Sequence, residues 1–168
     1  GAISATLMAL LNQGDHMVAS ADIYGGTYGL LTEEFPRFGI STTMADMRDP
    51  ASYEAAIQDN TKLLYIETLT NPVLKVCDSE AMADVAKRHN LLLLIDNTFA
   101  SPWGCKPLDM GVDLVLHSTT KYLGGHSDIL GGAVVGSKDL IAQIFMRKVH
   151  FGAAPDPHSC YLLERGMR

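Results

Sequence analysis

The stretch from Leu91 to Phe99 reads Leu-Leu-Leu-Leu-Ile-Asp-Asn-Thr-Phe, and it indicates the fold class of this chain. Four leucines and an isoleucine in succession lack the alternation of a strand that faces water on one side. A run of this length is typical of a strand covered on both faces, and Asp96 stands at its carboxyl end. We therefore expect a parallel sheet with helices on both sides.

Helical and strand-like patterns alternate along the rest of the chain, at the spacing of βαβ units. Pro50 suits the first turn of a helix, and Ser137 is a typical N-cap residue. The expected fold is a three-layer α/β/α sandwich with a mostly parallel sheet. The sequence predicts strands at 16–20, 40–45, 62–67, 91–95, 112–116 and 129–135, and helices at 2–11, 27–35, from 49 onward, 78–89 and 138–150.

Composition narrows the class of protein. The chain has 168 residues, of which 47% are hydrophobic, so one domain with a real core is expected and disorder is excluded. The net charge of −6 argues against a nucleic-acid partner. No apolar run reaches the ~18 residues of a membrane helix, and no secretory leader is visible.

The three cysteines, Cys77, Cys105 and Cys160, are far apart and odd in number. We expect reduced thiols and a cytoplasmic protein. The chain opens on Gly1 in what resembles the interior of a helix, so we expect a fragment of a longer protein.

Polar residues follow four of the predicted strands. In a parallel sheet the carboxyl ends of the strands form one edge, where ligands bind. Lys121 is the sharpest candidate, because a lysine with little access to water becomes a nucleophile. Asp96 would need a cationic partner there, such as Lys121, a metal or a protonated heterocycle. The candidates that join them at this edge are Tyr24, Glu67, Asn71, Ser118 and Thr120.

Each candidate alone also has a structural interpretation. Lys121 could begin a surface helix, Asp96 could be an N-cap, and Ser118 and Thr120 could be caps rather than phosphate ligands. Tyr24 could pack over the sheet edge rather than stack on a flat ligand, and Asn71 could be a turn residue. The signal is therefore the convergence of these residue types and not any one of them.

A different class of protein and a different kind of site would use similar residues. A signalling receiver domain also places an Asp, a Ser or Thr and a Lys at strand ends, as Asp96, Ser118 or Thr120, and Lys121 do here. It needs paired acids after its first strand, whereas Asp22 stands alone. A metal site is not expected, because no two histidines have helical ligand spacing.

Four stretches resemble the Cys/Met-metabolism group of pyridoxal-phosphate (PLP) enzymes. The resemblance covers the whole chain, and the set in this order is more specific than any one piece. The four stretches are Asp22-Ile-Tyr-Gly-Gly-Thr, Tyr65-Ile-Glu-Thr-Leu-Thr-Asn-Pro, Leu94-Ile-Asp-Asn-Thr-Phe and His117-Ser-Thr-Thr-Lys-Tyr-Leu-Gly-Gly-His-Ser-Asp.

The resemblance implies a cofactor, pyridoxal 5′-phosphate, and a role for each candidate. Lys121 would form the internal aldimine and Asp96 would bond the pyridinium nitrogen, which strengthens the ring as an electron sink. Tyr24 would stack on the ring and help move protons. The other implied roles are phosphate binding by Ser118 and Thr120, contact with the phenolic oxygen by Asn71, and support by Glu67 and Thr98.

The implied activity is sulfur amino acid (transsulfuration) metabolism, in which a C–S bond is cleaved or formed at the γ-carbon of a homocysteine- or homoserine-type amino acid. Cystathionine γ-lyase and γ-synthase types are nearly tied, and O-acylhomoserine sulfhydrylase and methionine γ-lyase types are alternatives. Gly26 stands where methionine γ-lyases typically carry a cysteine, which disfavours that type.

The resemblance also implies an architecture larger than this chain. Residues 1–150 would be the PLP-binding large domain of a fold-type I enzyme, incomplete at its N-terminus, with roughly seven strands. Residues 151–168 would be a linker and helix leading toward a C-terminal domain. The whole enzyme would be a homotetramer, a dimer of catalytic dimers, and this fragment alone is expected to lack activity.

Overall fold

The computed structural model describes residues 1–168, and its centre is a six-stranded sheet. The strand order is β2-β1-β3-β4-β5-β6, in which β6 alone runs antiparallel to its neighbour. The prediction of a mostly parallel α/β sheet is therefore confirmed, with six strands rather than about seven. The strands are β1 (His16–Ser20), β2 (Ser41–Ala45), β3 (Thr61–Glu67), β4 (Leu92–Asp96), β5 (Leu114–Ser118) and β6 (Gly132–Gly136).

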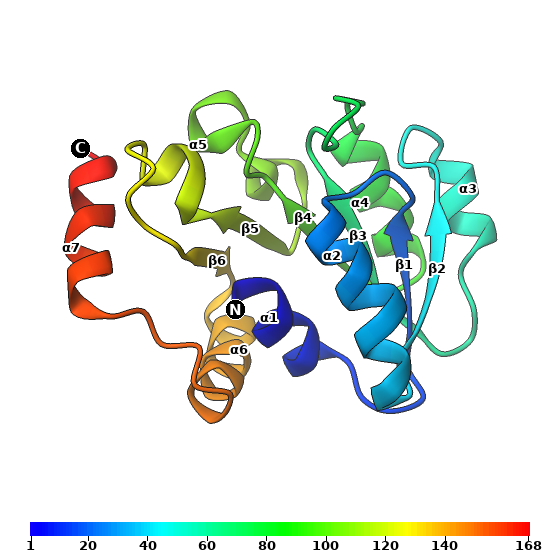
Figure 1. The fold of residues 1–168 in the computed structure, drawn as a ribbon. Helices are drawn as coiled ribbons and strands as arrows, with labels where there is room; N and C mark the ends of the chain where they lie inside the picture. The colour runs from blue at the N-terminus through cyan, green and yellow to red at the C-terminus, as the bar shows by residue number, and fades with distance from the viewer.

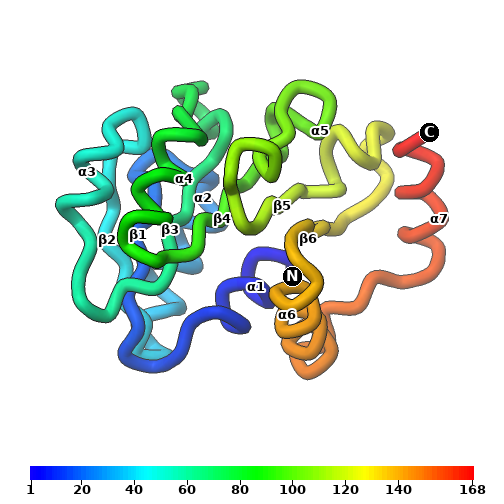
Figure 2. The backbone as a smooth tube through the Cα atoms, turned by 180° about the vertical axis from the view of Figure 1, so that it is seen from behind, coloured from blue at the N-terminus to red at the C-terminus, as the bar shows by residue number.

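Helices cover both faces of this sheet, as Figures 1 and 2 show from opposite sides. One set of apolar side chains packs α3 and α4 against one face, and a second set packs α1, α6 and the helical turns that continue α2 over residues 30–38 against the other. The three-layer prediction is thus confirmed. The helices are α1 (Ala2–Leu10), α2 (Gly25–Gly29), α3 (Pro50–Ala55), α4 (Ser79–Arg88), α5 (Ser101–Gly104), α6 (Lys138–His150) and α7 (Pro157–Gly166).

The two-sided burial of β3 illustrates why the central strands are continuous apolar runs. Leu64 and Ile66 belong to the core on the α3/α4 side, whereas Leu63 and Tyr65 belong to the core on the other side. Successive side chains of a strand point to opposite faces, so a strand covered twice needs apolar residues at every position. All four of these residues are fully buried.

Several element boundaries differ from the prediction. The helix expected at 27–35 begins at Gly25 and continues through two short helical turns to Phe38. Pro36 does not stop it, because Pro36 lies in the first turn of the last segment, where no N–H is required. The strand expected at 112–116 runs from Leu114 to Ser118, so Ser118 belongs to the strand and not to the loop after it.

The strands that follow β1 in the sequence are placed on both sides of it in the sheet. β2 lies on one side of β1, and β3 and all later strands lie on the other. Such a switch point leaves a crevice at the carboxyl ends of the strands, where ligands of open α/β sheets bind. No helix in the structure combines the length and the apolar character needed to cross a membrane.

Candidate active site

The carboxyl ends of β3, β4 and β5 bring three predicted residues to neighbouring positions. Glu67 is the register partner of Asp96 across β3 and β4, and Asp96 pairs with Leu116 of β5. Ser118 ends β5, two residues beyond Leu116, and pairs with Gly132 at the start of β6. The convergence predicted from the sequence is present for these side chains.

Asp96 is a largely buried carboxylate that forms no ion pair and has His117 nearby. It accepts hydrogen bonds from the backbone N–H of Thr98 at 2.9 Å and from the Thr98 hydroxyl at 2.5 Å. It forms none of the salt bridges in the structure. Burial raises its pKa above the ordinary value, although the bonds from Thr98 oppose that shift. A carboxylate that is held in place and forms no salt bridge can accept a hydrogen bond from the protonated nitrogen of a heterocycle. Asp96 therefore fits a pyridine cofactor.

Thr98 links Asp96 to the strand that leads to Lys121. Its hydroxyl oxygen accepts a hydrogen bond from the backbone N–H of Ser118 at 2.8 Å while the hydroxyl proton goes to Asp96. The orientation of the Asp96 carboxylate is therefore tied to the end of β5. This contact gives the supporting role predicted for Thr98 a structural basis.

Glu67 joins the two loops that carry Tyr24 and Asn71. One carboxylate oxygen accepts from the backbone N–H of Tyr24 at 2.9 Å, and the other accepts from that of Asn71 at 3.2 Å. Glu67 is only 4% exposed. Burial, together with the nearby Asp96 charge, raises its pKa to about 7, and the two backbone bonds hold it below a still higher value.

A second contact joins the same two loops. It is an ion pair that was not predicted from the sequence. Lys75, in the loop after Asn71, forms an ion pair with Asp22, two residues before Tyr24. Asp22 belongs to one of the recognised motifs, but no local pattern distinguishes Lys75 from a surface lysine. Only the folded chain brings the two charges together.

Tyr24 projects from the start of α2 with about half of its surface exposed. Its ring lies over Gly26: a Cβ added at Gly26 would be 2.5 Å from Cε1 of Tyr24 and 3.0 Å from Cζ. A larger residue at position 26 would therefore push the ring of Tyr24 out of its present place. The exposed ring face is available for stacking on a flat ligand.

Lys121 lies in a helical turn between β5 and β6, Thr119–Leu123, and breaks its helical geometry with φ −97° and ψ −124°. With Asn71 and Thr120 it lines a cavity of about 730 Å³, which Phe99 and Asp128 also line. Lys121 is exposed, so the limited access to water expected from the sequence is not found here, and its ammonium takes part in none of the salt bridges.

The structure gathers the predicted residues only in part around this cavity. Tyr24, Asp96 and Ser118 do not line it. The hydroxyl of Thr120, expected to face a phosphate, bonds the backbone of Gly131, accepting from its N–H at 3.0 Å and donating to its carbonyl at 3.3 Å. The hydroxyl of Thr120 thus already has protein partners.

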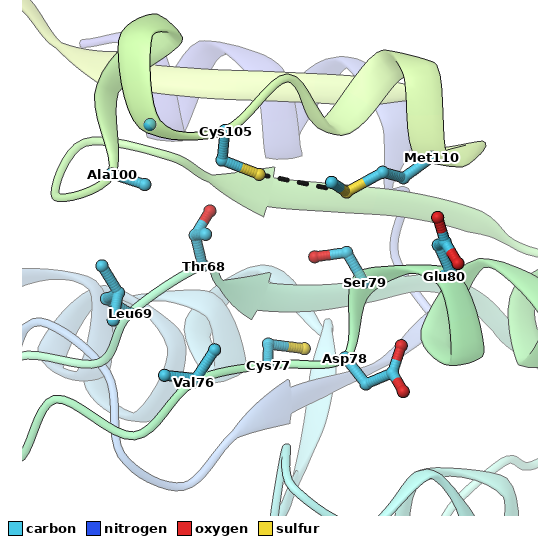
Figure 3. Close-up of a pocket in the computed structure, with 11 residues that line it drawn as sticks. Thr68, Leu69, Val76, Cys77, Asp78, Ser79, Glu80, Ala100, Cys105 and Met110 are labelled. Atoms are coloured by element: carbon cyan, nitrogen blue, oxygen red, sulfur yellow. Dashed lines mark hydrogen bonds between the residues drawn. The ribbon is translucent and has the colours of Figure 1, made fainter.

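A second cavity, of about 390 Å³, lies between the segment after β3 and the segment after β4, as Figure 3 shows. Thr68, Cys77 and Cys105 line it, and none of the predicted site residues does. All three cysteines of the chain are free thiols, and burial raises the pKa of Cys77 to about 12. The thiol of Cys77 is therefore protonated at neutral pH and unreactive as a nucleophile.

Fold and site together define a class of protein. A doubly covered parallel sheet with a lysine, a largely buried carboxylate and hydroxyl groups near its carboxyl edge suits an α/β enzyme that binds pyridoxal phosphate. A family model described as Cys/Met metabolism PLP-dependent enzyme matches residues 1–168. The chain belongs to this family.

Individual relatives agree with this assignment. The chain is 48% identical to a cystathionine gamma-lyase of Bacillus subtilis over 168 residues, which cover 99% of the chain and 44% of the relative. It is 45% identical to a probable cystathionine gamma-synthase of Herpetosiphon aurantiacus, covering 98% of the chain and 52% of the relative. The chain thus spans about half the length of the curated relatives it matches.

A solved structure shows the same fold. The crystal structure of cystathionine gamma-lyase from Lactobacillus plantarum complexed with L-serine superposes with a TM-score of 0.96 at 46% identity. The match covers 99% of this chain and 44% of the solved one. The prediction of a fold-type I large domain is confirmed by this likeness.

Proposed function

We propose that this chain is the cofactor-binding part of a PLP-dependent enzyme of sulfur amino acid metabolism. The enzyme would cleave or form a C–S bond at the γ-carbon of a homocysteine- or homoserine-type amino acid. The observation that carries the cofactor-binding part of the proposal is the largely buried Asp96 carboxylate, which is bonded by Thr98 and forms no salt bridge. Relatives named as a lyase and as a synthase are compatible with C–S cleavage and with C–S formation, which are different overall reactions.

The proposed cofactor contacts follow from the placement of the side chains. Asp96 would accept the proton of the pyridine nitrogen, Tyr24 would stack on the ring, and Asn71 would contact its phenolic oxygen. Ser118 and Thr120 would donate to the phosphate, with Thr120 exchanging its weak bond to the Gly131 carbonyl. When bound, the cofactor supplies an electron sink for the pair left at the substrate α-carbon.

The chain's own groups would then position and move protons. The Nζ of Lys121 would hold the cofactor covalently at rest and, once released, would take the α-proton of the substrate. Thr98 would keep the Asp96 carboxylate in one orientation through its hydroxyl bond. Glu67 would hold the Tyr24 and Asn71 loops at a set separation through their backbone N–H groups.

We further propose an organisation for the complete enzyme. Residues 1–150 would be the cofactor-binding domain, and residues 151–168 the connection toward a C-terminal domain. By family likeness the enzyme would be a cytoplasmic homotetramer built from two catalytic dimers. The free thiols of Cys77, Cys105 and Cys160 suit a reducing compartment. Sedimentation equilibrium of the complete protein measures its oligomeric state.

The direct test of the proposed function is a visible absorption spectrum with added PLP, followed by borohydride reduction and peptide mapping. We expect a yellow protein whose label maps to Lys121. Assays of the full-length enzyme with cystathionine, and with O-acylhomoserine plus cysteine, then separate lyase from synthase. A full-length protein that stays colourless and unlabelled would contradict the proposal.

The Tyr24→Phe variant tests the proton-transfer role of Tyr24. We expect it to bind PLP as wild type does, because the ring face is retained, and to turn over about 10²-fold more slowly, because the hydroxyl is lost. Cofactor affinity and kcat separate the two effects. The matched control is Tyr161→Phe, at an exposed position on α7. Unchanged kcat in Tyr24→Phe would remove the hydroxyl from the mechanism.

Glu67 makes the stability of the PLP-free protein depend on pH. Its pKa of about 7 in the folded state lies above the ordinary value of 4.5, so the folded state binds more protons between these values. This contribution to the free energy of unfolding is therefore full below pH 4.5 and is lost as the pH rises to about 7. The loss amounts to roughly 3 kcal/mol from the size of the shift.

The Glu67→Gln variant should lack this pH-dependent component, because an amide does not titrate. Urea unfolding of both proteins at several pH values from 4.5 to 8 measures the difference between them. Glu80→Gln, at an exposed position of α4, is the matched control and should follow wild type. Parallel pH profiles of wild type and Glu67→Gln would show that Glu67 does not titrate in this range.

A further inference from the structure

Helix α7 packs against the turn that carries Lys121. In Figures 1 and 2 the helix lies at one edge of the molecule beside the segment that follows β5, and both opposite views agree. From the sequence, this helix is expected only to lead toward a C-terminal domain. Its last two helical residues, Arg165 and Gly166, make contacts that give it a more specific role.

Gly166 meets the backbone of the Lys121 turn directly. A Cβ added at Gly166 would overlap the carbonyl oxygens of Leu123 and Gly124 and would lie 2.8 Å from the Gly124 carbonyl carbon. These are backbone atoms, so they cannot rotate away as the end of a side chain can. Only glycine allows α7 to come this close to the turn.

Arg165 makes the second contact, to the wall of the Lys121 cavity. Its guanidinium donates to a carboxylate oxygen of Asp128 at 2.6 Å, and Asp128 lines the same cavity as Lys121. The guanidinium lowers the pKa of Asp128, so Asp128 stays ionised and paired with α7. Two consecutive residues of one helix therefore hold the turn and the loop that follows it.

The turn is not a regular helix, so contacts from outside add to the few bonds that hold it. Lys121 departs from helical geometry, and two backbone bonds close the turn: Gly124 N–H to the Thr119 carbonyl at 2.9 Å and Gly125 N–H to the Lys121 carbonyl at 2.8 Å. The turn closes tightly on itself, since a Cβ at Gly124 would lie 2.5 Å from the Thr119 carbonyl oxygen. The turn is thus held between the end of β5, from which it continues, and α7.

We infer that α7 is a positioning element for Lys121, in which Gly166 seats the helix on the turn and Arg165 anchors it to Asp128. The inference rests on the proposed function only in taking Lys121 as the lysine that holds the cofactor. Neither residue lines the cavity beside Lys121. Each acts through the backbone of residues 119–128.

The main test compares Gly166→Ala with wild type in the absence of PLP. Amide hydrogen exchange, read by mass spectrometry, should accelerate by about tenfold in residues 119–125 as well as in α7, because local stability falls with loss of packing. Competitive labelling with acetic anhydride should show faster modification of Lys121, with Lys62 and Lys138 of the same molecule as references. Gly29→Ala is the matched control, because a Cβ there meets nothing within 4 Å.

The Arg165 variants test the second contact. Arg165→Gln should accelerate exchange in residues 119–125 by about two- to threefold, since one anchoring bond is lost, and Arg165→Lys should restore most of the protection by pairing with Asp128 again. With PLP bound, the pH dependence of the visible band should shift in Gly166→Ala and not in Gly29→Ala.

Two outcomes would overturn the inference. If α7 exchanges faster in Gly166→Ala while the 119–125 segment and the labelling of Lys121 stay as in wild type, α7 does not position the turn. If hydrogen exchange changes neither in α7 nor in residues 119–125, the close approach at Gly166 does not hold the helix against the turn. Both readouts are obtained without PLP, so failure of the proposed function, seen as wild type that does not bind PLP, is a separate result.

Discussion

Replacing Lys121 by alanine should abolish both covalent attachment of PLP and turnover. The amine is the group proposed to hold the cofactor and to take the α-proton, and no other lysine lines its cavity. Turnover of the full-length enzyme should fall by about 10³-fold or more, because general acid–base and nucleophilic roles are lost together. Borohydride trapping followed by peptide mapping, with kcat in parallel, measures both effects.

Lys62→Ala is the matched control for Lys121→Ala. Lys62 is an exposed residue at the opposite end of β3 from Glu67, so its removal should leave the spectrum and kcat unchanged. The proposed mechanism fails if the full-length Lys121→Ala variant turns over at the wild-type rate. It also fails if borohydride labels a different lysine of the wild-type protein.

Replacing Asp96 by asparagine should change activity and stability in opposite directions. The amide oxygen can still accept from the N–H and hydroxyl of Thr98, so the local structure is kept while the charge is removed. PLP should remain attached to Lys121, but turnover should fall by about 10²–10³-fold, because the charge that holds the ring nitrogen protonated is gone.

The stability effect follows from the sign of the pKa shift. Burial raises the pKa of Asp96 in the folded state, so the ionised form destabilises the PLP-free protein once the pH exceeds the ordinary value. Asp96→Asn should therefore raise the melting temperature of the PLP-free protein at pH 7. Added PLP should stabilise wild type more than the variant, because only the wild-type carboxylate pairs with the ring nitrogen.

Differential scanning calorimetry with and without PLP checks this pair of expectations. Asp109→Asn, at an exposed position, should leave both the melting temperature and kcat as in wild type. A lower melting temperature for PLP-free Asp96→Asn would show that the structure compensates the Asp96 charge in another way. Unimpaired kcat would remove Asp96 from the proposed cofactor contacts.

The sequence predicted the fold because its signals are local. The uninterrupted apolar run at 91–95 indicates a strand buried on both faces, and β4 is such a strand, with Leu93, Leu94 and Ile95 fully buried. The convergence of Glu67, Asp96 and Ser118 also followed, since parallel strands share one carboxyl edge. The predicted boundaries were less accurate. The strand predicted at 112–116 runs from Leu114 to Ser118, because the mixed pattern of Val112 and Asp113 does not mark where a strand begins.

The local sequence pattern could not show which charged side chains form contacts between different loops. Glu67 bonds backbone N–H groups, which every residue but proline has, so no side-chain motif marks its partners. The Lys75–Asp22 and Arg165–Asp128 pairs likewise join residues that look like ordinary surface charges in sequence. Their meeting depends on how the loops are laid over the sheet.

The sequence by itself therefore determined the layers of this protein, its family and the chemical types at the edge of its sheet. Periodicity and strand-end residues are properties of single segments, and each segment carries them before it packs. The tertiary structure alone decided that Glu67 joins two loops, that Asp96 is largely buried and forms no salt bridge, and that Gly166 seats α7 against the Lys121 turn. Burial and close approach are relations between distant segments, and they exist only once the chain is packed.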